Sequence, residues 1–383
     1  MKESEKLLFK LISTAICEQN IDVNAFEKVS GQDIESMWKL AGVHSLCPVI
    51  SAALVNNNLC DGDLRDFFVS EIYRAIRSDE MRTYELKNMC DVLNRERIPH
   101  IPLKGVIIKN MYPESWYRTC SDIDILVHKQ NFEKTLDIFI NQLKYSVIKK
   151  DEHDIGLRSP SGIYVELHHK LMESFVFEDK TFPDAWEYSH KTSEESYTYH
   201  MCDEMFYLYH IAHMAKHFKY GGFGIRLLID LWILNHIDNI DYDKRNNLID
   251  FASLKEFNYA VNRLSDIVFL GQESDETYDF FLRFILDSGT HGTKSNEVIS
   301  YRNNKNKTSY MLSRIFMPYK EFCLVYPELK TKKWLYPYRS VCRWLKILLR
   351  MDYKRISDEM KINNSLDERT VKGFKELSQK FNI

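Results

Sequence analysis

The chain has 383 residues, of which 44% are hydrophobic and 28% are charged, and its formal net charge is -3. This length allows two or three packed units, and the balanced charge excludes a surface that is basic overall and drawn as a whole to nucleic acid or membrane. The eight cysteines include no CxxC pair and no short regular spacing, which excludes a zinc ribbon and a small disulfide scaffold.

The first 95 residues are expected to form an N-terminal helical region. Apolar residues at helical spacing form one face of its first helix: Leu7, Leu8, Leu11 and Ile12. Lys6 and Lys10 interrupt the apolar pattern, which predicts an amphipathic helix rather than a signal peptide. Further helices are predicted at about 33–57 and 63–94, with a break at Gly62. No segment approaches the roughly 20 apolar residues of a membrane span, so a cytoplasmic protein with reduced thiols and no membrane partner is expected.

Residues 96–172 are expected to form a mixed α/β unit. The segment 98–103 is extended by pattern, because a residue before proline avoids the helical region. A short helix is predicted after Lys104 and Gly105, and a longer one at about 130–143. The remaining strands are predicted from alternation and turn residues, at 122–128, 145–150, 153–158 and 163–168.

The rest of the chain is predicted to be mainly helical. Residues 173–300 are expected to form a helical domain that completes a cleft, with helices from about 202 through 285 and a polar, loop-like segment at 287–308. Residues 301–383 are expected to form a basic and aromatic helical tail, interrupted by prolines at 318, 327 and 337. The expected fold class is therefore α+β.

Asp122 and Asp124 present two carboxylates on one face of a predicted strand, because alternate side chains point the same way. They can bind one hard cation or a pair of them, although a solvated strand face has the same pattern. Gly105, upstream, lacks a Cβ and would let phosphates approach backbone N–H groups, and Arg118 can neutralise a phosphate. Glu166 supplies a third carboxylate, and the set fits an in-line displacement assisted by two metal ions.

The stretch IPLKGVIIKNMYPESWYRTCSDIDILV, followed by GIYVELHHKL, resembles the uncharacterised bacterial nucleotidyltransferase family of the polymerase-β-like superfamily. The likeness continues through HIAHMAKHFKYGGFGIRLLIDLWIL and YPELKTKKWLYPYRSVCRWLK. It implies a minimal nucleotidyltransferase mixed sheet, flanked by N-terminal and C-terminal helical regions. It also implies that Asp122 and Asp124 bind both metals, and that Glu166 binds the catalytic metal and acts as, or beside, the general base.

The same resemblance assigns the nucleotide contacts. Gly105 and Arg118 would hold the triphosphate, with Lys104 beside them. The superfamily has Gly-Gly or Gly-Ser at this turn, whereas here Gly105 is followed by Val106.

The implied reaction is transfer of a nucleoside monophosphate from an NTP to a hydroxyl, with release of pyrophosphate and dependence on Mg²⁺, or on Mn²⁺ in its place. The acceptor is left open between a small molecule, a protein and RNA, and no DNA partner is expected. One alternative is a toxin-like enzyme acting on RNA ends, since such toxins have similar Lys-Gly and Asp-x-Asp patterns. The other is a non-catalytic nucleotide-binding module, against which the three carboxylates argue.

Three histidines are candidates for the same cleft. His168 alternates with Glu166 and would orient it, contact the triphosphate or simply be exposed. His213 and His217 have the spacing of helical zinc ligands, but Met214 replaces the glutamate of an HExxH motif. A polar stripe lining a nucleotide cleft is therefore favoured over zinc, and the resemblance points the same way.

Two further features have two readings each. Arg226 and Asp230 are spaced to pair on a helix as a weak surface contact, or the arginine meets a nucleotide phosphate. The stretch 330–355 contains nine basic residues and the single acid Asp352, and its basic residues are interleaved with Trp334, Tyr336, Tyr338 and Trp344. This combination is typical of a nucleic-acid surface, but a packed amphipathic helix with a solvated charged face is the favoured interpretation.

Overall fold

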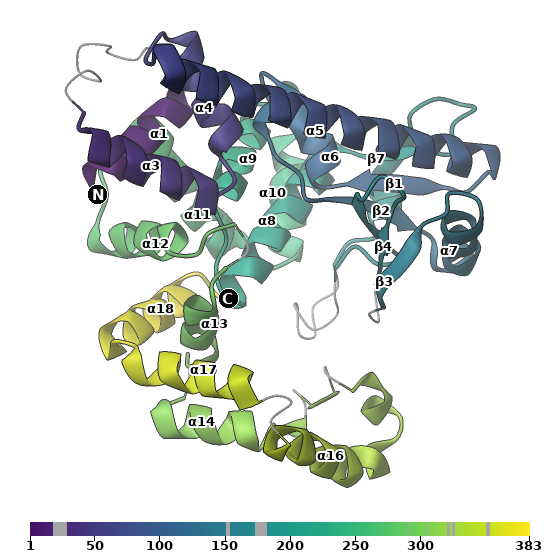
Figure 1. The fold of residues 1–383 in the computed structure, drawn as a ribbon. Coiled ribbons are helices and arrows are strands. Elements are labelled where there is room, and N and C mark those ends of the chain that lie inside the picture. The colour runs from purple at the N-terminus through teal and green to yellow at the C-terminus, as the bar shows by residue number, and fades with distance from the viewer. Residues whose placement is uncertain are drawn as a thin grey trace. The chain divides into compact units, whose positions relative to one another are not determined.

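The structure is a computed structural model (Figure 1) that describes residues 1–17, 29–150, 154–172, 182–290, 292–303, 305–319, 322–323, 326–349 and 353–383. The chain forms two compact units, one of Met1–His213 with Ile225–Glu273 and one of Met214–Gly224 with Ser274–Ile383. The division into four regions made from the sequence is a finer one and stays a prediction. Within the described ranges, no helix is long and apolar enough to cross a membrane. All eight cysteines are free thiols.

The first unit begins with the predicted helical region, which contains α1 (Glu3–Ile16), α3 (Gly31–Val43), α4 (Cys47–Asn56) and α5 (Gly62–Arg95). The apolar face of α1 is buried and packs against α3 and α4. The single helix expected at 33–57 is two helices. Ser45 adopts a positive φ of 58°, which ends the first one, and Pro48 lies in the first turn of the next. The predicted break is present, since α4 ends at Asn56 and Gly62 is the first residue of α5.

A five-stranded mixed sheet follows, in the order β1-β2-β5-β4-β3. Its strands lie close to their predicted positions: β1 (His100–Leu103), β2 (Asp122–Val127), β3 (Ser146–Lys150), β4 (Asp154–Arg158) and β5 (Tyr164–His168). Strands β2 and β5 are parallel, and the other neighbouring pairs are antiparallel. The helices α6 (Gly105–Ile108) and α7 (Phe132–Asn141) match the two predicted in this region. The α+β fold class is confirmed.

The two faces of this sheet have different chemistry. Ile123, Ile125 and Val127 of β2 belong to a buried apolar cluster that includes the C-terminal end of α5 and the apolar residues of α7. Because side chains alternate along a strand, Asp122 and Asp124 lie on the opposite face. The helices that cover the apolar face thus leave the acidic residues of the central strand on the other side.

The first unit continues through η4 (Ala185–Tyr188), the short strands β6 (Ser189–Lys191) and β7 (Tyr199–Met201), and α8 (Asp203–Lys219). It also contains α9 (Ile225–Asn235), α10 (Tyr242–Phe251) and α11 (Lys255–Leu270). The boundary between the two units falls within α8, after His213.

The second unit is helical and contains α12 (Glu276–Leu286), α13 (Lys294–Tyr301), α14 (Lys307–Ile315), η5 (Pro327–Lys330), η6 (Lys333–Leu335), α16 (Tyr336–Leu348), α17 (Tyr353–Ser365) and α18 (Glu368–Lys380). The loop predicted at 287–308 was wrong where α13 forms, because Thr293 caps this helix by accepting from the backbone N–H of Asn296. Val298 and Ile299 then bury its apolar side. Residues 291 and 304 of that segment lie outside the described residues.

Candidate functional site

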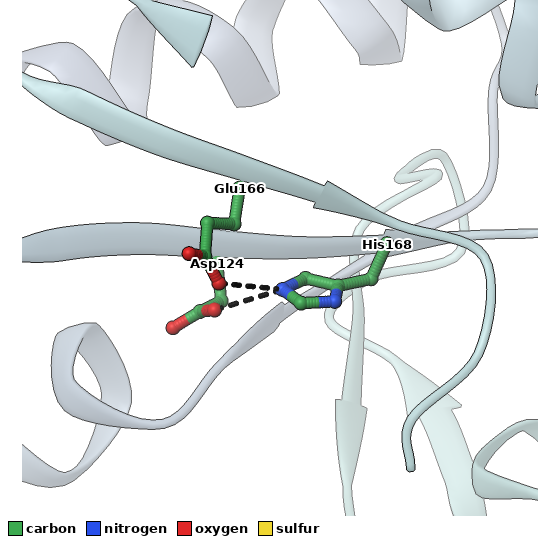
Figure 2. Close-up of side chains that lie close together, drawn as sticks. All are labelled: Asp124, Glu166 and His168. Atoms are coloured by element: carbon green, nitrogen blue, oxygen red, sulfur yellow. Dashed lines mark hydrogen bonds and ion pairs between the residues drawn. The ribbon is translucent and has the colours of Figure 1, made fainter. Parts of the chain in front are cut away.

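Two neighbouring strands bring Asp124, Glu166 and His168 together. In the parallel pairing of β2 with β5, Asp124 lies directly opposite Glu166, and His168 follows two residues later on the same face. Figure 2 shows the three side chains pointing toward one another, with the imidazole Nε2 facing both carboxylates. Nε2 lies 2.8 Å from Asp124 Oδ1 and 3.4 Å from Glu166 Oε2. A ligand atom from each residue lies within 4.8 Å of those of the other two.

Two positive groups neutralise this cluster. Lys104 Nζ lies 3.0 Å from the same oxygen of Asp124 that His168 contacts. Burial alone would raise the pKa of Asp124, but the Lys104 ammonium and the His168 imidazole outweigh it and hold that pKa well below its ordinary value. Burial alone would lower the pKa of His168, but hydrogen bonds to Asp124 and Glu166 raise it to about 9. The imidazole therefore carries a proton at neutral pH.

Lys104 reaches Asp124 from an unusual backbone conformation. Its φ of 50° and ψ of -123° precede α6, and this region is costly for any residue with a side chain, by about 1–3 kcal/mol. Tyr209 of α8 is almost fully buried, and burial raises the pKa of its hydroxyl, whereas the nearby Lys104 ammonium opposes that rise. Burial lowers the pKa of Lys104, but the surrounding carboxylates outweigh it and raise that pKa well above its ordinary value. The lysine is therefore a permanent cation beside the carboxylates.

Asp122 occupies the outer part of the same strand face. It is half-buried, and its carboxylate accepts a hydrogen bond of 3.1 Å from Ser121 Oγ. It lies near enough to Lys104 to contribute to the raised pKa of that ammonium, but the converging group consists of Asp124, Glu166 and His168. A role for Asp122 as a metal ligand stays a prediction.

The donor atoms of the cluster fit a divalent cation. Carboxylate oxygens suit Mg²⁺ and Mn²⁺, and an imidazole nitrogen is accepted by transition metals. Ligand atoms at neighbouring positions of an octahedral ion lie about 3 Å apart, given metal–oxygen distances near 2.1 Å. The contacts of 2.8 Å and 3.4 Å made by His168 Nε2 agree with this spacing. Asp124, Glu166 and His168 can therefore hold one ion together once the imidazole Nε2 has released its proton, as a histidine must to bind a metal.

Gly105 is required here by a neighbouring side chain. A Cβ on this residue would lie 2.2 Å from Arg118 Nη1 and 2.8 Å from Cys120 Sγ. The space that was expected to admit a phosphate next to the Gly105 backbone is thus filled by a guanidinium group. The contact of Gly105 with a triphosphate stays a prediction, whereas its packing against Arg118 explains the glycine by itself.

Gly105→Ala should lower the free energy of unfolding by about 1–3 kcal/mol, the usual cost of overpacking a tight site. Arg118 cannot easily yield, because Asp230 holds it in place. Urea denaturation followed by circular dichroism measures the change. Gly31→Ala is the control, since a Cβ at Gly31 meets nothing within 4 Å and should leave the midpoint almost unchanged. Equal midpoints for both variants would contradict the steric role of Gly105.

Arg118 and Asp230 form a buried ion pair. Arg118 Nε and Nη2 donate to the two carboxylate oxygens of Asp230 at 3.1 Å and 2.9 Å, and the Tyr112 hydroxyl donates to the same carboxylate at 2.5 Å. Asp230 is fully buried and Arg118 is 7% exposed. Asp230 was expected to pair with Arg226, four residues earlier, and instead pairs with Arg118 across 112 positions of the chain. A direct contact of Arg118 or Asp230 with a nucleotide stays a prediction.

Arg226 lies beside this pair with a different set of partners. Its Nη1 donates to the backbone oxygen of Thr119 at 3.0 Å and to the Thr119 hydroxyl at 3.3 Å. Where the structure describes its surroundings, Arg226 forms no ion pair of its own. Burial and the nearby Arg118 guanidinium lower its pKa, against the opposing effect of Asp230. Two guanidinium groups therefore share one carboxylate, which leaves excess positive charge at this place.

The remaining candidates are not members of the cluster formed by Asp124, Glu166 and His168. His213 is half-buried on α8, with its ring 6.4 Å from that of Tyr209, and His217 belongs to the second unit. A nucleotide contact for either histidine stays a prediction. In the stretch 330–355, Arg350 and Asp352 lie outside the described residues, as does the side chain of Arg355.

Two tyrosines of the site were missed at the sequence level. Tyr209 lies near the Lys104 ammonium, which affects its pKa, and the Tyr112 hydroxyl donates to Asp230. Tyr209 stands four residues before His213 on the same helix, so the stripe noted for the histidines could have included it. No feature of the sequence around Tyr112 indicated its role, because its partner Asp230 lies 118 residues away in the chain.

Residues 30–269 match the model of a protein family described as an uncharacterised nucleotidyltransferase. The match covers the sheet, the cluster of Asp124, Glu166 and His168, and the Arg118–Asp230 pair. No curated protein matches the chain, and no solved structure does.

Proposed function

The chain belongs to the family of uncharacterised nucleotidyltransferases, and from this membership we propose that it transfers a nucleoside monophosphate from an NTP to a hydroxyl group of an acceptor. Pyrophosphate would be the second product, and the donor would be bound together with Mg²⁺ or Mn²⁺. The observation that carries the proposal is the pairing of Asp124 with Glu166 on adjacent parallel strands. Carboxylates held at fixed positions can bind the metal ions that assist an in-line displacement at phosphorus.

Each carboxylate has its own part in this proposal. A divalent ion held by Asp122, Asp124 and Glu166 would stabilise the charge that develops on the phosphate oxygens. Glu166 also accepts the proton of the attacking hydroxyl, since its side chain is 24% exposed and open to an acceptor. His168 bridges Asp124 and Glu166 and keeps both carboxylates in position.

Positive groups near the cluster would bind the triphosphate. Lys104 is half-buried beside Asp124, and an incoming polyphosphate offers it a stronger counter-charge than one carboxylate oxygen does. Arg226 is a second candidate, because it forms no ion pair among the described residues. Arg118 would act through position, since its pairing with Asp230 fixes the backbone around Gly105.

Lys104→Met should raise the affinity of the metal-free protein for Mn²⁺ by about tenfold or more, because it removes a positive charge 3.0 Å from Asp124 Oδ1. The same variant should bind an NTP more weakly. Electron paramagnetic resonance of free Mn²⁺ during a titration measures the first effect, and calorimetry measures the second. Lys129→Met is the control, since Lys129 is exposed on η3 (Lys129–Asn131). Weaker Mn²⁺ binding by Lys104→Met would show that the lysine supports the ion rather than competing with it.

The acceptor can be found by following the label. The protein is incubated with each α-labelled NTP and Mg²⁺ or Mn²⁺, together with separate pools of small metabolites, protein and RNA. Label that appears in one pool identifies the acceptor class, and label in RNA alone would favour an enzyme acting on RNA ends. NTP binding without transfer to any pool would favour a non-catalytic module.

A further inference from the structure

The helix α16 of the second unit turns apolar side chains to solvent. Six large apolar residues in or beside it, here called the apolar stripe, are exposed by between 40% and 74%: Trp334, Tyr338, Val341, Trp344, Leu345 and Leu349. Spacings of three and four residues place Tyr338, Val341, Leu345 and Leu349 along one side of the helix. Phe316, itself 58% exposed, packs edge-on against Trp344 and extends the apolar surface. Such a patch is unusual on a protein without a partner.

The arginines of α16 face the other way. Arg343 is 7% exposed, and its two terminal nitrogens donate to the backbone oxygens of Ile315 and Arg314 at 3.0 Å and 2.6 Å. Arg339 pairs with Glu328 at 2.6 Å. The amphipathic helix expected from the sequence is thus present, but its apolar side is exposed and its two arginines bond within the protein. The interpretation with a solvated charged face was wrong in this respect.

Positive charge surrounds the apolar stripe. Residues 330–349 contain six basic residues and no acidic one. Lys332 and Lys333 lie exposed next to Trp334, and Lys346 lies exposed next to Leu345. An exposed face of Trp, Tyr and aliphatic residues bordered by lysines has the composition of helices that lie in the interface of a bilayer.

We propose that α16 attaches the protein to the surface of an anionic lipid bilayer. The apolar stripe would enter the bilayer at the level of the headgroups, where Trp and Tyr side chains are favoured. The lysines would lie against lipid phosphates, whose charge is complementary to theirs. The attachment is peripheral, and it departs from the expectation that the protein has no membrane partner.

Two other occupants fit the surface less well. Single-stranded RNA binds to stacking aromatic rings beside cations that reach its phosphates. Val341, Leu345 and Leu349 stack no bases, and the two arginines of α16 already bond within the protein, Arg343 to backbone oxygens and Arg339 to Glu328. A second copy of the chain would bring two sets of lysines together, since the segment 330–349 has no acidic residue to pair with them.

The test is flotation of the full-length protein with lipid vesicles. Binding is expected to vesicles of phosphatidylcholine with about 30% phosphatidylglycerol and to be about tenfold weaker with phosphatidylcholine alone. Leu345→Gln with Leu349→Gln should abolish the binding, because it removes two apolar side chains of the stripe. Both side chains are exposed, so the replacement should spare the fold. Lys332→Gln with Lys333→Gln should weaken it and reduce its sensitivity to salt. Tyr259→Gln is the control, since Tyr259 of α11 is 69% exposed outside the stripe and its loss should leave binding unchanged.

Two results would overturn the proposal. The unchanged protein would fail to bind anionic vesicles, or the Leu345→Gln, Leu349→Gln variant would bind them as well as the unchanged protein does. Binding of a fluorescent single-stranded RNA that only the stripe variants lose, without vesicle binding, would assign the surface to RNA. A dimer in solution that the same variants dissociate, again without vesicle binding, would assign it to a second copy. Nucleotide transfer in solution should be unaffected by the stripe variants, so the proposed reaction is tested separately.

Discussion

Glu166→Gln should lower the rate of nucleotide transfer by about 10²-fold or more, the scale of losing a positioned base. The glutamine keeps the shape of the side chain and its place on β5, but it cannot accept the proton of the attacking hydroxyl. NTP binding with Mg²⁺ should largely survive, because Asp122 and Asp124 remain. A pyrophosphate-release assay measures the rate, and calorimetry measures the binding.

Asp124→Asn provides the contrast within the same cluster. Asp124 contacts both Lys104 and His168, so its neutralisation should weaken metal-dependent NTP binding as well as turnover. Glu133→Gln is the control for both variants, since Glu133 is exposed on α7, which covers the opposite face of the sheet. Equal loss of NTP binding in Glu166→Gln and Asp124→Asn would contradict the separate roles of the two carboxylates, and full activity of Glu166→Gln would remove Glu166 from the reaction.

Asp230→Asn should lower the free energy of unfolding by about 3–5 kcal/mol, because removing one partner of a buried pair leaves an uncompensated charge. That charge is the Arg118 guanidinium, which is 7% exposed and has Arg226 nearby. The shift should appear in urea denaturation of the metal-free protein. This measurement does not depend on the reaction. It tests whether the Arg118–Asp230 pair stabilises the fold around Gly105.

Glu35→Gln is the matched control for Asp230→Asn. It breaks an ion pair with Lys39 in which both side chains are more than half exposed, so solvent already screens the interaction. Its unfolding midpoint should stay at that of the unchanged protein. If Asp230→Asn also left the midpoint in place, the Arg118–Asp230 pair would not hold the region around Gly105.

The local pattern of polar and apolar residues was sufficient to predict the strands of the sheet and the acidic residues that they present. The alternation of polar and apolar residues in 122–127 and 163–168 identified β2 and β5. The period of two along each strand also decides which residues of that strand share a face. Asp122 could therefore be placed with Asp124, and Glu166 with His168, before the pairing of Asp124 with Glu166 was known. The position of Lys104 next to Asp124 could not, since it depends on a positive φ that sequence reasoning does not assign to a lysine.

Long-range partners were beyond local pattern. The spacing of Arg226 and Asp230 suggested a pair on one helix, whereas the partner of Asp230 is Arg118, 112 residues earlier. The position of Arg118 also explains why residue 105 is a glycine, because a Cβ there would clash with the guanidinium whether or not a phosphate binds. Periodicity likewise showed that α16 is amphipathic without showing which side faces the protein, because that choice depends on the backbone oxygens of Arg314 and Ile315.

Two samples of the same NTP, one labelled at the α-phosphorus and one at the γ-phosphorus, test the proposed reaction most directly. Each is incubated with Mg²⁺ or Mn²⁺ and the acceptor pools, for the unchanged protein and for Glu166→Gln. Transfer of a nucleoside monophosphate predicts α label in the acceptor and γ label in pyrophosphate, with both products reduced by about 10²-fold or more in the variant. Appearance of the γ label in the acceptor would mean phosphoryl transfer and would contradict nucleotide transfer at Asp124 and Glu166.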